Sequence, residues 1–321
     1  MGSAAVGQIP FAVGHTAQQC VAELHAPVLG DAHQGPLDKM VQTYAVIGAT
    51  GATGGAVVSA LAERGLRVRA IARNPQSPRA QKLAQEGIEI AAADLGDERA
   101  LTAAFTGVTG VFAVTTPFEE GPDIEVAQGL HIIGAAVQAR VPHLVYASVS
   151  NADQHTGIPH FDSKAKIEQA LTESGLPHTI VGPTYFYDNM LGGIDELRAG
   201  QFALPLPTTT PLQQLSRRDL GRFVAIILQE PQRFMGLRID VASDAPTPLQ
   251  MTAALEHALG YPIELVTYDP SRIASADMRA MFSFLSAHGY SVDIADLHRR
   301  YPEIGWQTFS EWVDEHLTTR A

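Results

Sequence analysis

Short apolar runs alternate with amphipathic stretches from Tyr44 to about residue 183. The first run, TYAVIG at 43–48, is typical of a strand that is buried on both faces. The stretch after it places Val57, Val58 and Leu61 at helical spacing and ends at Gly65. Five further apolar runs alternate with helical stretches in the same way, and they cover 66–72, 88–95, 108–116, 141–150 and 177–183. Strand and helix in alternation predict right-handed crossovers, and therefore an α/β fold with a doubly wound parallel sheet of the Rossmann type.

The longest helical stretch, 124–140, has four bulky apolar residues at helical spacing. They are Val126, Leu130, Ile133 and Val137, and we expect their side chains to form the buried stripe of this helix.

After Pro183 the alternation loosens. Pro and Thr are frequent in 203–216, which predicts loops, whereas 217–229 reads as a helix and 236–242 as a strand. Two amphipathic helices are expected at 248–260 and 309–317. We therefore expect a sheet domain over 42–184 and a smaller C-terminal substrate lobe over 185–321, which is interleaved with the sheet.

Residues 1–40 keep neither helical nor strand periodicity for long. We expect a poorly ordered N-terminal extension there, with Met40 as a candidate native start, and the alternative is a tail that packs on the body or on a partner.

The 321-residue chain carries a formal charge of −12 and has no cluster of Lys and Arg. Direct binding to nucleic acid is therefore disfavoured. The single cysteine, Cys20, excludes an intramolecular disulfide and indicates reducing surroundings. The chain has no basic start followed by an apolar core and no run of ~18 apolar residues, so it predicts neither a targeting peptide nor a membrane span. These features together predict a soluble, cytoplasmic protein.

The loop between the first strand and the first helix is rich in glycine. Gly48, Gly51 and Gly54 are three residues apart, and small residues there let main-chain N–H groups reach a diphosphate at the positive end of the helix. This predicts a dinucleotide site, with Thr50, Ala52 and Thr53 in the same loop; the alternative is a tight turn without a ligand.

The end of the second strand favours NADP(H) over NAD(H). Arg73 stands where an NAD site usually carries an acidic residue, and Arg79 and Lys82 follow it. A guanidinium can bind a 2′-phosphate, although Arg73 could also be a solvated turn residue. Asp94, after the third strand, is predicted to contact the adenine amino group or else to cap the helix that starts near Asp97.

Several blocks in this order resemble the NmrA-like proteins, a branch of the atypical short-chain dehydrogenases/reductases. The resemblance covers about 43–317 and rests on VIGATGATGG, AIARNP, FAVTTPFEEG, VPHLVYASV, HFDSKAKIEQAL, LPHTIVGPTYFYDN and FSEWVDEHL. It implies an NAD(P)-binding Rossmann domain and either a reductase or a redox-sensing regulator.

The Tyr-x-x-x-Lys pair of most short-chain reductases is missing, because no tyrosine here has a lysine four residues later. His160 stands in the tyrosine position, with Lys164 four residues on. Lys164 shares a buried helix face with Ile167, Glu168 and Leu171. The resemblance implies that Lys164 orients the cofactor or polarises a substrate; alternatively, it is a lysine paired with Glu168. His160 either relays a proton or simply precedes a helix cap at Asp162.

The remaining candidate residues follow strand ends and would line the nicotinamide half of the pocket. They are Thr115, Thr116, Pro117, Ser148, Pro183 and Tyr185, with Phe186 and Asn189 as further pocket walls. Ser148 stands where reductases keep a substrate-binding hydroxyl, and the alternative is an ordinary strand-end serine. Tyr185 and Phe186 could be plain core. No metal site and no Gly-x-Ser-x-Gly nucleophile loop is predicted.

Two functions follow from these residues. The first is an NADPH-dependent reductase of a small carbonyl, enone or quinone, with Lys164, His160 or water as the proton source. The second is a regulator that binds NADP(H) without turnover and reports its redox state to a protein partner. An epimerase is less favoured, because that chemistry also uses the missing Tyr–Lys pair.

Overall fold

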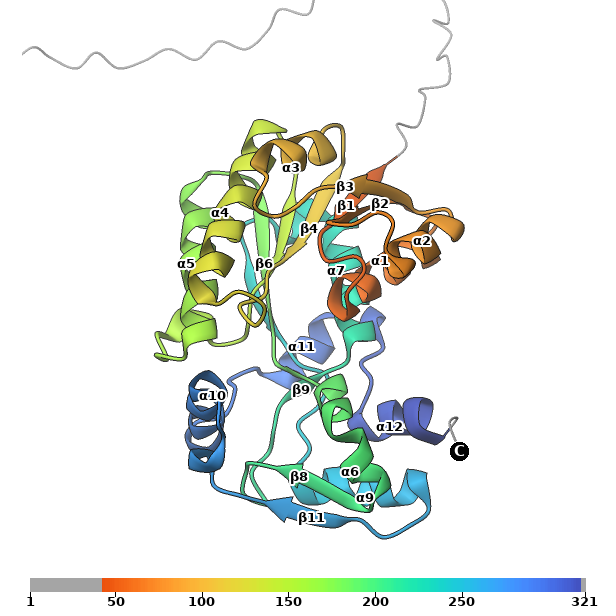
Figure 1. Ribbon diagram of the computed structural model, residues 1–321, viewed down its shortest axis with the longest axis vertical. Helices are drawn as coiled ribbons and strands as arrows, with labels where there is room; N and C mark the ends of the chain where they lie inside the picture. The colour runs from red at the N-terminus through yellow and green to blue at the C-terminus, as the bar shows by residue number, and fades with distance from the viewer. Residues whose placement is uncertain (1–41, 319–321) are drawn as a thin grey trace, which may run out of the picture. The chain divides into compact units, whose positions relative to one another are not determined.

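A seven-stranded sheet organises the computed structural model, which describes residues 42–318 (Figure 1). Its strands are β1 (Thr43–Val46), β2 (Arg67–Ala72), β3 (Glu89–Ala92), β4 (Gly110–Val114), β5 (Leu144–Ala147), β6 (His178–Pro183) and β10 (Arg238–Val241). They lie in the order β10-β6-β5-β4-β1-β2-β3, and every neighbouring pair is parallel. The predicted doubly wound Rossmann sheet is therefore confirmed.

Helices cover both faces of the sheet. Tyr44 and Val46 of β1 belong to one core, whereas Ala45 and Ile47 belong to the other, as the alternation of a strand requires. The first core is closed by α1 (Ala52–Glu63), α2 (Pro78–Gln85) and α7 (Arg217–Gln229), and the second by α3 (Glu98–Phe105), α4 (Pro122–Gln138) and α5 (Pro159–Glu173).

The chain after β6 builds a smaller lobe but returns twice to the sheet, through α7 and β10. The other elements are η1 (Ala152–Gln154), β7 (Tyr185–Phe186), η2 (Tyr187–Gly193), α6 (Ile194–Arg198), β8 (Gln201–Leu204), β9 (Gln214–Leu215), α8 (Pro231–Phe234), α9 (Pro248–Leu259), β11 (Glu264–Thr267), η3 (Pro270–Arg272), α10 (Ala276–Ala287), α11 (Ile294–Arg300), η4 (Pro302–Ile304) and α12 (Phe309–Leu317). The lobe has its own core, in which Tyr187 packs against Phe309 and Trp312.

The predicted buried stripe of α4 is correct only in part, because Ile133 lies in the core at 7% exposure. Leu130 and Val137 are 48% and 46% exposed, and the buried face instead includes Glu125 and Gly129. A Cβ on Gly129 would lie 2.6 Å from the Ile167 side chain, so α5 packs directly against the backbone of α4. Close helix packing selects small residues at such a contact, and the bulkier Leu130 and Val137 face solvent instead.

One sequence prediction concerns a part of the chain that the structure does not describe, and another can be compared with the described helices. The N-terminal extension 1–40, with Met40 and Cys20, lies outside residues 42–318. Within 42–318, none of the helices combines the length and the apolar character needed to cross a membrane.

Candidate functional site

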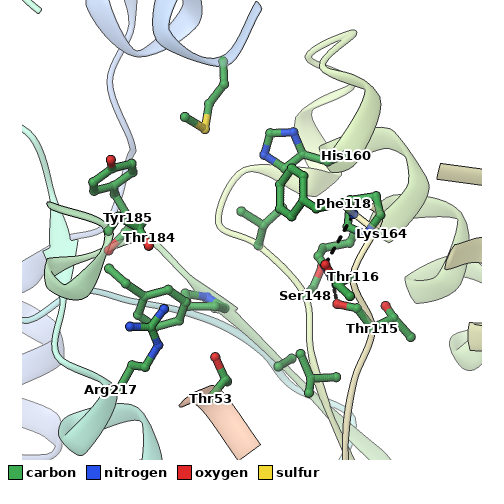
Figure 2. A pocket seen from close by; sticks show the side chains of 18 of the residues that line it. Thr53, Thr115, Thr116, Phe118, Ser148, His160, Lys164, Thr184, Tyr185 and Arg217 are labelled. Carbon is green, nitrogen blue, oxygen red and sulfur yellow. Dashed lines mark hydrogen bonds between the residues drawn. The ribbon is translucent and has the colours of Figure 1, made fainter. Parts of the chain in front are cut away.

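Two adjoining cavities lie at the carboxyl ends of the strands, where the strand order reverses between β1 and β4. The glycine-loop cavity has a volume of about 360 Å³ and is lined by the loop that joins β1 to α1. The aromatic cavity has a volume of about 600 Å³ and is walled by Phe118, Tyr185, Phe186 and Tyr290 (Figure 2). Thr53 and residues 114–116 line both, so one elongated ligand can extend through them.

Every residue predicted for a site lines one of the two cavities. The glycine-loop cavity takes Gly48, Thr50, Gly51, Ala52, Gly54, Arg73 and Asp94; the aromatic cavity takes Pro117, Ser148, His160, Lys164, Pro183 and Tyr185; and Thr53, Thr115 and Thr116 line both. The fold thus brings the predicted residues together, while their individual roles remain predictions.

The glycine loop forms a tight cradle. The N–H of Gly51 donates to the carbonyl of Gly48 at 2.8 Å, and Gly48 itself has φ +69°. A Cβ on Gly54 would lie 2.2 Å from that same carbonyl oxygen. Helix α1 starts at Ala52 without a side-chain cap and without an acidic residue in its first turn. An uncapped helix N-terminus at the cavity wall fits a bound diphosphate.

Replacing Gly54 with alanine is expected to weaken dinucleotide binding at least about tenfold and to lower the free energy of unfolding by about 1–3 kcal/mol, since the backbone must shift to admit the methyl group. Gly55→Ala is the matched control, because its Cβ would lie 3.5 Å from the nearest atom, an ordinary contact. Calorimetric titration and urea unfolding measure the two effects. If both variants bound the dinucleotide with equal affinity and had equal free energies of unfolding, the tight cradle at Gly54 would be contradicted.

Arg73 already has a partner at the mouth of the glycine-loop cavity. Its Nη2 lies 3.1 Å from Oε2 of Glu119, and both side chains are exposed. Asp94, Glu119 and Glu120 also line this cavity, so one guanidinium faces three carboxylates. Neither Arg79 nor Lys82 is among the lining residues. A 2′-phosphate at Arg73 would therefore have to compete with Glu119.

Asp94 does not cap α3. Its Oδ1 accepts a hydrogen bond from the N–H of Gly96 at 2.8 Å, whereas Asp97 caps the helix by accepting from the N–H of Ala100 at 3.0 Å. The capping alternative for Asp94 is therefore wrong.

Lys164 is held by a carboxylate that the sequence analysis missed. Its Nζ donates to Oε1 of Glu125 at 2.9 Å and to the carbonyl of Thr115 at 3.1 Å. Glu125 has no exposed surface, and it also accepts from the hydroxyls of Thr115 (2.8 Å) and Ser163 (2.5 Å). The alternative that paired Lys164 with Glu168 is wrong, because the Glu168 carboxylate is bound by Ser148 and Arg238.

Glu168 belongs to a second buried group, behind Ser148. The Ser148 hydroxyl donates to Oε1 of Glu168, and Nε of Arg238 donates to Oε2 at 2.9 Å. The hydroxyl of Ser148 is therefore oriented by Glu168 at the wall of the aromatic cavity.

Tyr146 is the tyrosine next to Lys164, whose Nζ lies 5.7 Å from the centre of its ring. Its hydroxyl is 3.1 Å from Oγ1 of Thr115. Burial, reinforced by the charge of Glu125, raises the pKa of Tyr146 well above its usual value. Because this tyrosine is fully buried and holds its proton tightly, it does not replace the missing Tyr-x-x-x-Lys tyrosine.

His160 lies inside helix α5 and not before it, since α5 begins at Pro159 and Ile158 is its N-cap. The reading of Asp162 as a cap is therefore wrong. Nδ1 of His160 lies 2.5 Å from Oδ1 of Asp277, which α10 of the smaller lobe supplies. No described residue is hydrogen-bonded to Nε2, and His160 lines the aromatic cavity. This arrangement resembles an oriented general acid–base pair.

The opposite wall of the aromatic cavity carries Tyr185 and Arg217 (Figure 2), and Phe186 lines the same cavity. Burial raises the pKa of Tyr185 to about 12, so this phenol stays neutral. The guanidinium of Arg217 stacks 4.6 Å above the centre of the Phe186 ring.

Sequence analysis missed three charged residues of the site: Glu125, Asp277 and Arg217. Only Glu125 left a usable signal, because a stripe at 125, 129, 132, 133 and 136 has helical spacing and contains one carboxylate among apolar and small residues. The other two reach the site from α10 and α7, far along the chain.

Residues 40–313 match the NmrA-like family model. An NmrA-like family domain-containing oxidoreductase of Aspergillus sp. (strain MF297-2) is 34% identical over 248 residues, which are 68% of this chain and 73% of that protein. A (4-alkanoyl-5-oxo-2,5-dihydrofuran-3-yl)methyl phosphate reductase of Streptomyces griseus subsp. griseus is 32% identical over 233 residues, 71% of this chain and 79% of that protein.

Among solved structures, the NADPH-dependent quinone oxidoreductase QOR2 of Escherichia coli, complexed with NADPH, superposes with a TM-score of 0.73 at 27% identity. The superposition covers 85% of this chain and 99% of that protein.

Proposed function

This chain belongs to the NmrA-like family, and from that premise we propose that it binds NADP(H) and reduces a small carbonyl, enone or quinone. The observation that carries the proposal is the junction of the two cavities, where Thr53, Thr115 and Thr116 line both and Lys164 lies beside them. A bound nicotinamide would supply the hydride. The chain would supply alignment of the two reactants and a proton.

The named relatives support this class of acceptor. The quinone oxidoreductase reduces a quinone with NADPH, and the Streptomyces reductase is named for a dihydrofuran ring that bears an oxo and an alkanoyl group. Both names describe carbonyl groups conjugated with an unsaturated ring.

The two ends of the nucleotide would be held by different residues. The amides of 52–54 would bind the diphosphate, Arg73 the 2′-phosphate and Asp94 the adenine amino group. Residues 115–117, Ser148, Pro183 and Tyr185 would line the nicotinamide half, as their place in the aromatic cavity allows.

His160 is the better placed proton donor. The Nζ of Lys164 is engaged by Glu125 and Thr115, so its role is to hold the loop after β4 and to contribute positive charge. His160 has Asp277 on Nδ1, which leaves Nε2 to donate a proton in the aromatic cavity.

A thermal-shift series with NADP⁺, NADPH, NAD⁺ and NADH, followed by NADPH oxidation assays, tests the proposal. Binding to the native state raises the melting temperature by mass action, and we expect the largest rise with NADPH. We further expect steady-state oxidation of NADPH with menadione or with an enone. A protein that ignores all four nucleotides would refute the proposal.

Replacing Arg73 with alanine is expected to weaken NADPH binding by about 1.5–3 kcal/mol, the size of a charged hydrogen bond, and to leave NADH nearly unchanged. Glu119→Gln should act in the opposite direction, by up to about 1 kcal/mol, because it removes an exposed competing carboxylate. Isothermal titration of each variant with both nucleotides measures this. Equal losses for NADPH and NADH in Arg73→Ala would exclude the 2′-phosphate assignment.

A regulator that binds NADP(H) without turnover is the second candidate. It is favoured by the missing Tyr-x-x-x-Lys pair and by the engagement of Lys164 in a buried ion pair. Tight NADPH binding together with no oxidation across a broad acceptor panel would support this candidate over the reductase.

A further inference from the structure

The aromatic cavity is basic although the chain is acidic overall. His160, Lys164 and Arg217 line it, and none of its lining residues is Asp or Glu, whereas the whole chain carries a formal charge of −12. The carboxylates that pair with these three side chains, Asp277, Glu125 and Asp188, are not among the lining residues. Three basic side chains therefore line the cavity, while the carboxylates that pair with them lie behind its wall.

Arg217 is the basic group whose hydrogen-bonding capacity is left unused. Its Nη1 lies 2.8 Å from Oδ2 of Asp188, but the atoms are not aligned as a hydrogen bond. Within residues 42–318, Arg217 donates no hydrogen bond, and its Nε is buried without an acceptor. By contrast, Lys164 donates to two acceptors and His160 is bound at Nδ1. Because Nη2 has no acceptor among the described residues either, this end of the guanidinium can donate to a carboxylate, sulfonate or phosphate that enters the cavity.

Arg217 lies on the opposite side of the cavity from the groups that would take part in proton transfer. Figure 2 shows Arg217 across the cavity from His160 and Lys164. Each side of the cavity has an aromatic ring: Tyr185 lies on the side of Arg217, and Phe118 lies beside His160, with 5.5 Å between the two ring centres. The Phe118 side chain is 66% exposed. An exposed aromatic ring at a cavity wall offers a stacking face for a flat ligand.

We propose that Arg217 is an anion subsite for the substrate, and that the substrate is a flat conjugated acceptor with a carboxylate, sulfonate or phosphate at the end remote from its reducible group. That the substrate accepts a hydride rests on the proposed reductase function, but the anion subsite itself can be tested by binding alone. The diphosphate of the nucleotide is the competing source of an anion at Arg217. Arg217 lines the aromatic cavity and not the glycine-loop cavity, which favours the substrate.

The decisive measurement is a calorimetric titration of the protein, saturated with NADP⁺, with 2-naphthoate and with 2-naphthamide. These probes share one shape and differ in charge. We expect the wild-type protein to bind the carboxylate at least tenfold more tightly than the amide. Arg217→Met should abolish the preference, and Arg217→Lys should keep part of it. Arg198→Met is the matched control, because it removes the same charge from an exposed surface position outside the cavity.

Each outcome decides a different point. A wild-type protein without preference, or an Arg198→Met variant that loses as much as Arg217→Met, overturns the subsite. If Arg217→Met lowers the affinity for NADP⁺ together with that for 2-naphthoate, Arg217 belongs to the nucleotide site, and the substrate subsite is overturned. If the wild-type protein does not bind NADP⁺, the proposed function fails, and the same titration without nucleotide still tests the subsite.

The turnover assay extends the test to the reaction. Steady-state kcat/KM for 1,2-naphthoquinone-4-sulfonate relative to 1,2-naphthoquinone should fall at least tenfold in Arg217→Met, mainly through KM for the sulfonate. Equal losses for both quinones would contradict a role in binding the anionic group.

Discussion

Lys164→Met is expected to lower the free energy of unfolding by about 3–5 kcal/mol, which is the usual cost of removing one partner of a buried ion pair. The reason is Glu125, whose side chain is 0% exposed and whose carboxylate is bound by Lys164 at 2.9 Å. Without the ammonium, the hydroxyls of Thr115 and Ser163 are left to stabilise a buried negative charge. Urea unfolding followed by circular dichroism measures the loss.

Two further variants separate stability from chemistry. Lys166→Met removes the same charge from the exposed face of the same helix and should change the free energy of unfolding by less than about 0.5 kcal/mol. The double variant Lys164→Met with Glu125→Gln removes both charges and should recover most of the lost stability. If turnover stays low in this stable double variant, the ammonium contributes to the reaction and not only to folding. A single variant as stable as the wild type would refute the buried ion pair.

The sheet could be read from the sequence because parallel strands are buried on both faces. Such strands appear as short apolar runs, and the run at 43–48 marks β1 without help from any distant residue. The glycine loop could be predicted from local sequence as well, since its three glycines lie between adjacent elements.

Helix α4 shows why local periodicity fails at the site. The helix buries Glu125, because a cation 39 residues further along the chain, Lys164, neutralises it. Hydrophobic spacing counts apolar residues and cannot register a charge that a distant partner stabilises. The same reason hid Asp277 from the sequence analysis, since it meets His160 across a separation of 117 residues.

The difference between residues that could be predicted locally and residues that distant contacts bring together has a functional meaning. The predicted nucleotide residues lie on consecutive loops of one sheet, whereas His160 and Asp277 come from the two lobes of the described chain. A proton donor assembled across the lobes depends on how the smaller lobe packs, so the residues that bind the nucleotide and those that would complete the reaction can be separated by mutation.

His160→Gln is expected to reduce kcat by about 10²–10³-fold for a carbonyl or enone acceptor, the range expected when a general acid is lost. NADPH affinity should stay within twofold, because His160 does not line the glycine-loop cavity. A quinone should lose less, since the hydroquinone anion formed from it is a weaker base and needs less help from an acid. Stopped-flow measurements of NADPH oxidation with both acceptors compare the two losses.

In the proposed reaction Asp277 would act only through His160, and its replacement tests that relation. Asp277→Asn should reduce kcat by about tenfold, because an amide in place of the carboxylate no longer fixes the proton on Nδ1 of His160. In the His160→Gln background the same change should have no further effect on kcat, since two residues that act as a unit are not additive. Added imidazole should partly restore turnover in His160→Ala. If His160→Gln keeps the wild-type rate and solvent isotope effect with an enone, then water donates the proton and the His160–Asp277 pair is only a contact between the lobes.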